Sequence, residues 1–170
     1  MTILKHLSYD IGTDIDVFTP RIPLQRMYGE DNTVARVCVA PSVDDCLYGS
    51  PYTAELFPRD GYIERGEVAI VCHTDAVGDD YHGVPFVIYT FDVSDDDVMT
   101  PAALTELVPD ATYTDEHWLI ASATPIKREV YLLHDAVFAE GDWRYFYMKL
   151  DPSDVARFTP VDAGDYILGL

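Results

Sequence analysis

The cysteine and histidine residues are the first candidates for chemistry, because a thiolate can act as a nucleophile or bind a metal ion. The chain has three cysteines, Cys38, Cys46 and Cys72, and no CxxC pair. Their spacings match no zinc module. Cys72 directly precedes His73, and adjacent side chains on a strand point to opposite faces, so these two cannot form a nucleophile–base dyad. We therefore expect small core thiols that stay reduced in a cytoplasm.

Motifs for a phosphate-binding loop, a metalloprotease, a calcium loop or a serine hydrolase are absent from the sequence. No metal site is therefore predicted. The remaining candidates for chemistry are single ionisable side chains. What they can do depends on the elements that carry them.

The length and composition of the chain are sufficient for a hydrophobic core. The chain has 170 residues, of which 48% are hydrophobic and 24% charged. This length and composition predict one folded domain over residues 1–170. No leading basic-then-apolar segment and no apolar run of about 18 residues is present, so we expect a cytoplasmic protein without a membrane span.

The charge balance limits which classes of partner the chain can bind. The chain carries 30 acidic and 11 basic residues, for a net charge of −19. Such a surface repels phosphate backbones and anionic lipids, so we expect neither nucleic acid nor membrane as a partner. The excess of acid either attracts a basic partner protein or only keeps the chain soluble, and both interpretations stay open.

The predicted elements are mostly strands. One short helix is expected from the N-cap Ser42 to Gly49, and another over residues 101–108 after the N-cap Thr100. Two short helices are too few for a doubly wound parallel sheet, so the sequence predicts an α+β fold of mixed, mostly antiparallel sheets. Alternating or β-branched and aromatic runs predict strands at residues 3–9, 35–40, 67–73, 85–93, 116–122, 127–134 and 143–150.

Four short segments form an ordered pattern over about residues 1–134. They are His6-Leu7-Ser8 on the first strand, the strand–turn–helix RVCVAPSVDDCLYG, the strand FVIYTFDV, and Thr114–Leu119 leading into KREVYLL. This order resembles ADP-ribosyltransferase-like proteins, particularly the rifampin ADP-ribosyltransferase type. The segments TPRIP, GED and VCVAPSVDDCL also resemble small proteins of phages and gut bacteria.

The resemblance implies an ADP-ribosyltransferase-like fold and NAD as the substrate of a glycosyltransferase reaction, in which ADP-ribose passes to a protein or small molecule. Nicotinamide leaves through an oxocarbenium-like ribose. His6 would donate to a ribose hydroxyl and so position NAD, and Glu116 would stabilise the developing positive charge. Asp92 is the substitute for Glu116.

The resemblance also implies a cofactor-binding surface around these two residues. Ser8 lies on the same strand face as His6. One of Arg21, Arg26 or Arg36 would bind the pyrophosphate bidentately. The alternative for the arginines is ion pairing with the many acids of the chain.

The chain departs from the family pattern at two places. Leu7-Ser8 stands where a Gly-Thr pair is expected, and Cys38 stands where an aromatic residue would stack on nicotinamide. Tyr48, Tyr52 or Tyr89 could supply the ring instead. The departures leave open whether the chain is an enzyme; the alternative is a non-catalytic phage or bacterial accessory protein that binds a basic host protein. The oligomeric state also stays open.

Overall fold

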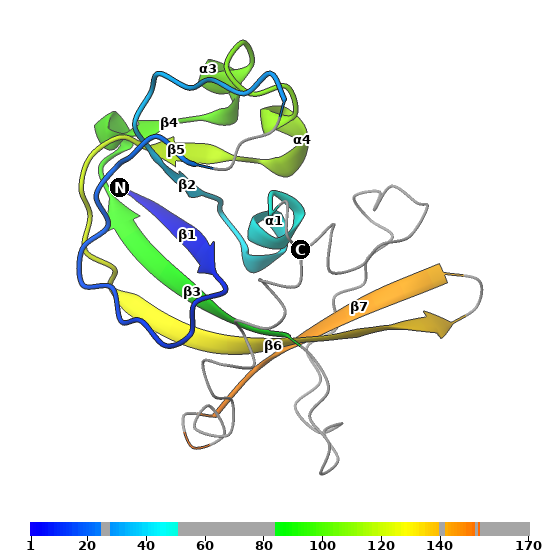
Figure 1. Ribbon diagram of the computed structural model, residues 1–170. Helices are drawn as coiled ribbons and strands as arrows, with labels where there is room; N and C mark the ends of the chain where they lie inside the picture. The colour runs from blue at the N-terminus through cyan, green and yellow to red at the C-terminus, as the bar shows by residue number, and fades with distance from the viewer. Residues whose placement is uncertain (25–27, 51–83, 140–141, 152, 154–170) are drawn as a thin grey trace. The chain divides into compact units, whose positions relative to one another are not determined.

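The computed structural model describes residues 1–24, 28–50, 84–139, 142–151 and 153 (Figure 1). By its internal contacts the chain divides into two compact units. Unit 1 comprises Met1–Leu7, Ile15–Leu56 and Ile88–Arg128. Unit 2 comprises Ser8–Asp14, Phe57–Val87 and Glu129–Leu170. The single domain over residues 1–170 stays a prediction.

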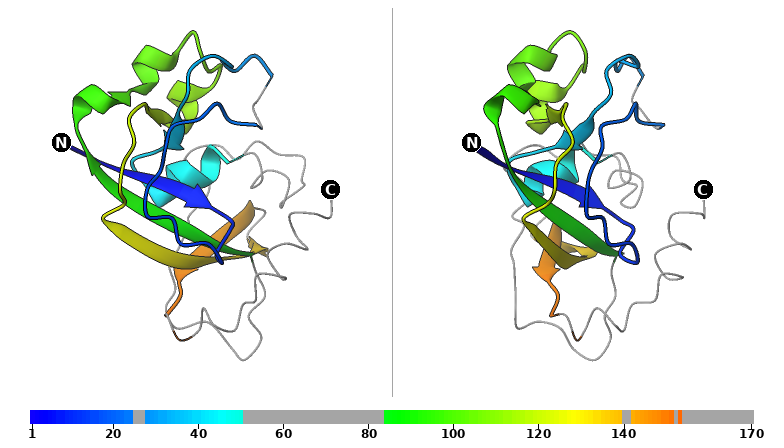
Figure 2. Two further views of the ribbon diagram at one scale, coloured as in Figure 1. Left: turned by 60° about the vertical axis from the view of Figure 1, so that its left-hand side comes forward. Right: turned by 90° about the vertical axis from the view of Figure 1, so that its left-hand side faces the viewer.

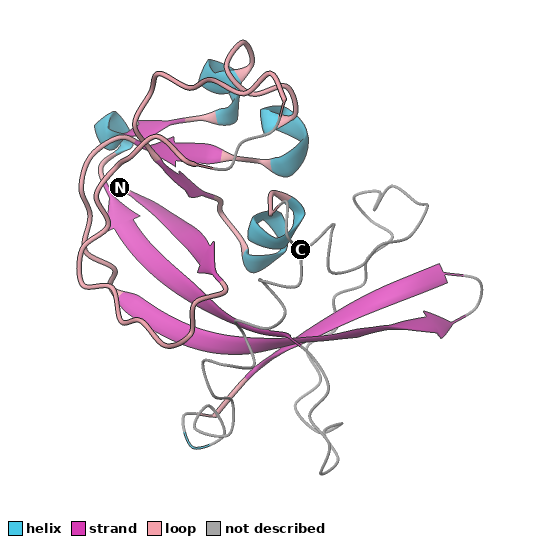
Figure 3. Ribbon diagram, in the orientation of Figure 1, coloured by secondary structure: helices cyan, strands magenta, loops and turns pink. Residues whose placement is uncertain are grey.

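Strands dominate the described residues, and the helices are short (Figure 3). None of the described helices is long and apolar enough to cross a membrane. In chain order the elements are β1 (Thr2–Ser8), β2 (Val37–Val39), α1 (Val43–Tyr48), β3 (Val84–Val93), η1 (Asp95–Asp97), β4 (Val98–Met99), α3 (Pro101–Leu104), α4 (Ala111–Thr114), β5 (His117–Leu119), β6 (Lys127–Ala139) and β7 (Asp142–Lys149).

The strands form two sheets. One has the order β1-β3-β6-β7 and the other the order β2-β5-β4; Figure 2 shows β1 beside β3. The pairs β2–β5, β4–β5 and β6–β7 are antiparallel. The register of β2–β5 sets Cys38 opposite Trp118. The predicted α+β class with mostly antiparallel strands is thus confirmed.

Helix α1 begins and ends at the predicted residues. The Ser42 side chain accepts a hydrogen bond from the backbone N–H of Asp45 at 3.1 Å, which satisfies one free donor of the first turn. At the other end, the N–H of Gly49 donates to the Asp45 carbonyl at 2.9 Å. Val43, Cys46 and Leu47 are buried. Both caps are local, which is why the sequence located them.

The segment after β4 differs from the prediction. The helix expected over residues 101–108 ends at Leu104, and the chain continues in turns in which Leu107 and Val108 donate to the Leu104 carbonyl at 2.8 and 2.9 Å. The three elements η1, β4 and α4 were not predicted, because each is only two to four residues long and gives no periodic signal. The predicted strand over 67–73 lies outside the described residues.

Two groups of packed side chains contribute to the core of unit 1 among the described residues. The first contains Leu104, Val108, Ala111 and Trp118, with Cys38 among the side chains packed against it. In the second, the ring of Phe18 meets Tyr89, Phe91 and His6 edge-on, at centroid distances of 4.8, 5.2 and 5.1 Å. Unit 2 has an aromatic group of its own, built from Tyr9, Phe86, Tyr131 and Tyr147.

The cap of α1 gives the first testable prediction. Ser42→Ala removes the side-chain acceptor at the first turn, and we expect it to lower the free energy of unfolding by about 1 kcal/mol in urea titrations. Thr100→Ala is the matched control, because Thr100 is also an N-cap but makes no side-chain cap hydrogen bond. Equal losses in the two variants would contradict this account of α1.

Candidate functional site

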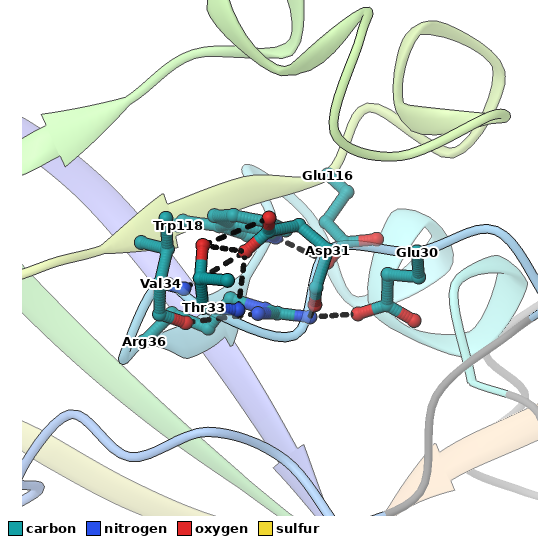
Figure 4. A network of polar contacts seen from close by, with 7 residues as sticks. All are labelled: Glu30, Asp31, Thr33, Val34, Arg36, Glu116 and Trp118. Atoms are coloured by element: carbon teal, nitrogen blue, oxygen red, sulfur yellow. Dashed lines mark hydrogen bonds and ion pairs between the residues drawn. The ribbon is translucent and has the colours of Figure 1, made fainter.

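A buried arginine organises the residues before β2. The side chain of Arg36 is fully shielded from solvent and forms an ion pair with Glu30. Its Nη1 donates to the Val34 carbonyl at 2.9 Å, and its Nη2 donates to the Asp31 carbonyl at 3.1 Å (Figure 4). A buried charge is tolerated only when it is paired and hydrogen-bonded, and the 30–34 loop supplies both.

An aromatic ring on β5 completes the enclosure of Arg36. The guanidinium carbon lies 3.8 Å from the centroid of the Trp118 ring, which is a close cation–π stack. The indole Nε1 of Trp118 donates to Oε1 of Glu116 at 2.7 Å, so the orientation of the ring is itself fixed (Figure 4). Glu116 therefore acts on Arg36 through Trp118.

The loop that carries Glu30 is rigidly folded. The Asp31 carboxylate accepts from the backbone N–H groups of Thr33 and Val34, both at 2.8 Å. The hydrogen bond from Val34, followed by that from Thr33, holds the pKa of Asp31 below its usual value. The N–H of Asp31 donates to the Leu107 carbonyl at 2.8 Å. Gly29 begins the loop at φ +90°, a conformation that favours glycine.

The backbone of Arg36 also holds Arg21. The two residues exchange N–H to carbonyl hydrogen bonds of 2.9 and 3.2 Å in an antiparallel bridge. The side chain of Arg21 is exposed, whereas that of Arg36 is buried. This bridge therefore fixes the backbone from which the exposed side chain of Arg21 extends, opposite the residue whose side chain is buried.

His6, on β1, is fixed by β2. Its Nδ1 lies 2.8 Å from the Cys38 carbonyl, and a carbonyl can only accept, so Nδ1 carries the proton and Nε2 carries the lone pair. Burial is the main cause that lowers the pKa of His6; the bond to Cys38 opposes the shift, and the nearby charge of Arg21 adds to it. The imidazole is thus neutral at pH 7, with Nε2 as a hydrogen-bond acceptor.

Cys38 contacts two of the predicted site residues. Its carbonyl accepts from His6, and its thiol lies close enough to the Glu116 carboxyl for each to affect the pKa of the other. Burial is the largest cause that raises the pKa of Cys38, and burial likewise raises the pKa of Cys46 to about 12. Both thiols are therefore protonated and unreactive at neutral pH, as expected of core cysteines.

The predicted site residues separate into two groups. His6 and Arg21 lie close enough for the charge of Arg21 to affect the imidazole, while Arg36 and Glu116 meet at Trp118. Among the described residues, no hydrogen bond or ion pair joins His6 to Glu116. Arg36 makes the ion pair that was its alternative role.

The other predicted residues make no contact with His6 that the structure describes. The hydroxyl of Ser8 accepts from the Asp10 N–H at 3.2 Å, and Asp92 is exposed on β3. Tyr89 is fully buried, so it cannot serve as a platform for nicotinamide. Arg26 and Tyr52 lie outside the described residues. Within the described part of the chain, no group of three or more potential ligands is arranged to hold a metal ion.

Sequence reasoning did not single out Glu30 or Trp118 for a site. Glu30 was expected only as a charged residue of an ordered loop, and Trp118 entered only with the Thr114–Leu119 piece of the resemblance. A glycine directly before an acidic residue, as at Gly29-Glu30, is one sequence pattern that could have drawn attention to the loop.

Glu116 gives a prediction with a definite sign. Burial raises its pKa, against the hydrogen bonds from Trp118 and Cys38. Its contribution to stability is therefore fully present below about pH 4.5, the ordinary value, and is lost as the pH rises through the folded-state pKa. Glu116→Gln keeps an acceptor for Trp118 but does not ionise.

We accordingly expect the free energy of unfolding of the wild type to fall relative to Glu116→Gln as the pH is raised from 4.5 to 7, measured by urea titration. The exposed residue Glu106 supplies the control, Glu106→Gln, whose difference from the wild type should not follow this trend. A constant difference between wild type and Glu116→Gln over the same range would contradict a pKa of Glu116 that burial raises.

Comparison with known proteins adds no relative: no protein-family model, curated protein or solved structure matches the chain.

Proposed function

We propose that the chain is a nucleotide-binding protein of ADP-ribosyltransferase-like type that binds NAD at His6 and Arg21. The observation that carries the proposal is the fixed tautomer of a neutral His6 next to an exposed arginine. Both residues belong to unit 1, and both are tied to β2 or to the residue before it by backbone groups. Their positions are therefore set before any ligand arrives.

His6 would accept a hydrogen bond from a ribose hydroxyl. Its Nδ1 proton is committed to the Cys38 carbonyl, so a ligand would have to donate to the Nε2 lone pair. The sequence led us to expect the imidazole as a donor, and the geometry reverses that role. A hydroxyl is a suitable partner because it can donate to Nε2 and still accept from elsewhere.

Arg21 would bind the pyrophosphate. A guanidinium presents paired N–H donors that match two phosphate oxygens. The chain has a net charge of −19, so a phosphate is repelled by most of the surface and needs a local cation. Arg21 is exposed, and no hydrogen bond or ion pair of its side chain is found among the described residues.

The transfer of ADP-ribose to a protein or small molecule requires a carboxylate near the ribose. Glu116 is the predicted residue, but its Oε1 is occupied by Trp118 and its side chain also contacts Cys38. Binding of the nucleotide is thus the better supported part of the proposal. Release of nicotinamide from NAD is the measurement that decides whether transfer follows.

Isothermal titration of NAD tests the site. We expect His6→Ala and Arg21→Gln each to weaken binding by about tenfold, because each removes a hydrogen bond to the ligand and about 1.4 kcal/mol is a factor of ten. Binding should also weaken as the pH falls through the lowered pKa of His6, because protonation removes the acceptor at Nε2.

The control is Lys127→Gln, which removes one exposed positive charge of unit 1 at a residue that makes no contact with His6 among the described interactions. It should bind NAD as the wild type does. Absence of heat with NAD in the wild type, or equal weakening by Lys127→Gln, would contradict the proposal. Nicotinamide release should be assayed in the same samples.

A second candidate is binding to a basic partner protein. The observation that favours it is a group of exposed carboxylates where β3 leads into η1, at Asp92, Asp95 and Asp96. Asp95 is hydrogen-bonded to Thr2 and to the amino terminus, which lowers its pKa and keeps it charged. A cationic segment could pair with these side chains without displacing any core contact.

Polylysine binding tests this candidate. The double variant Asp92→Asn/Asp96→Asn should weaken the binding and reduce its salt dependence, as surface ion pairing requires. The control Asp14→Asn/Asp16→Asn removes the same charge elsewhere. If both double variants bind alike, only the net charge matters and the group at β3–η1 is not a docking site.

A further inference from the structure

We propose that Arg36 is the positioning residue of this nucleotide site: its buried guanidinium fixes the backbone segment 36–38, which bonds to both His6 and Arg21. This inference rests on the proposed function for the identity of the ligand. It adds a residue that contacts no ligand itself.

The guanidinium is immobilised from three directions. Glu30 supplies the counter-charge, and the carbonyls of Asp31 and Val34 accept from its terminal nitrogens. Trp118 covers one face of the plane at 3.8 Å. The Nε of Arg36 is buried without a hydrogen-bond partner, which costs free energy. The other contacts must offset this cost, so loss of any of them should loosen the segment.

The backbone of Arg36 transmits this rigidity to Arg21. Both the N–H and the carbonyl of Arg36 are bonded to Arg21, so Arg21 cannot shift along the bridge without breaking both bonds. The exposed guanidinium of Arg21 therefore starts from a backbone position that the buried guanidinium of Arg36 determines. A flexible cation would lose more conformational entropy on binding pyrophosphate.

The same segment reaches His6 two residues further on. Side chains at i and i+2 of a strand share a face, and accordingly Arg36 and Cys38 both lie on the Trp118 side, where Cys38 is opposite Trp118 in the register of β2–β5. The Cys38 carbonyl then lies in the hydrogen-bonding direction of the strand, where it accepts from His6. The stack of Arg36 on Trp118 thus sets where that carbonyl is found.

The test reads His6 directly and needs no ligand. Long-range ¹H–¹⁵N NMR spectra distinguish the Nδ1–H from the Nε2–H tautomer of a histidine. In the wild type we expect the Nδ1–H form. Arg36→Lys keeps the positive charge for Glu30 but lacks the planar group that stacks on Trp118 and bonds to two carbonyls. We expect the His6 signals of this variant to move towards a mixture of tautomers and its pKa to rise towards the ordinary value.

Two further variants keep the result decisive. Glu30→Gln removes the counter-charge of Arg36 with little change in the shape of the side chain. If Arg36→Lys does not fold, the His6 spectrum of Glu30→Gln is the test instead. Val93→Ala truncates a buried side chain at the end of β3 that makes no contact with Arg36 in the described interactions. This control should destabilise the fold and leave the His6 signals unchanged at temperatures where it is folded.

The outcomes separate this inference from the proposed function. Unchanged His6 signals in a folded Arg36→Lys or Glu30→Gln variant, or an equal change in Val93→Ala, would overturn the positioning role. If the wild type binds NAD, Arg36→Lys should weaken the binding by roughly tenfold. If the wild type does not bind NAD, the proposed function fails, while the His6 spectra still decide whether Arg36 positions the histidine.

Discussion

The stack of the Arg36 guanidinium on Trp118, with Glu30 as counter-charge, is the interaction on which the proposed site in unit 1 depends. A buried ion pair is a costly way to fill a core, because both charges lose their hydration. The chain retains one where the 30–34 loop, β2 and β5 meet. The consequence of this arrangement is that several segments are held in fixed positions. The 30–34 loop, β5 and Arg21 all contact Arg36, through its guanidinium or its backbone.

Glu116 shows how the same residue can be expected to have a catalytic role and be found in a structural one. The resemblance to ADP-ribosyltransferase-like proteins implied that it would stabilise positive charge on a ribose. In the structure its carboxyl group holds the indole of Trp118 and contacts Cys38, and burial raises its pKa. A carboxyl that burial pushes towards its neutral form is a weaker electrostatic partner for a cation, and a good acceptor for an indole N–H.

Local features of the fold were predictable and pairings across the chain were not. The caps of α1 at Ser42 and Gly49 follow from residues within one helical turn, and β3 follows from its own run of β-branched and aromatic residues. The contact of Arg36 with Trp118 depends on the register of two strands far apart in sequence. The tautomer of His6 likewise depends on a carbonyl, which every residue has and no sequence motif marks.

The proposed site depends on β2 holding His6 as a neutral imidazole whose proton lies on Nδ1. The most direct measurement is the ¹H–¹⁵N spectrum of His6 in the wild-type protein as the pH is varied. The account predicts an Nδ1–H tautomer at pH 7 and a pKa below the ordinary value of 6.5. An Nε2–H tautomer, or an imidazolium at pH 7, would contradict it.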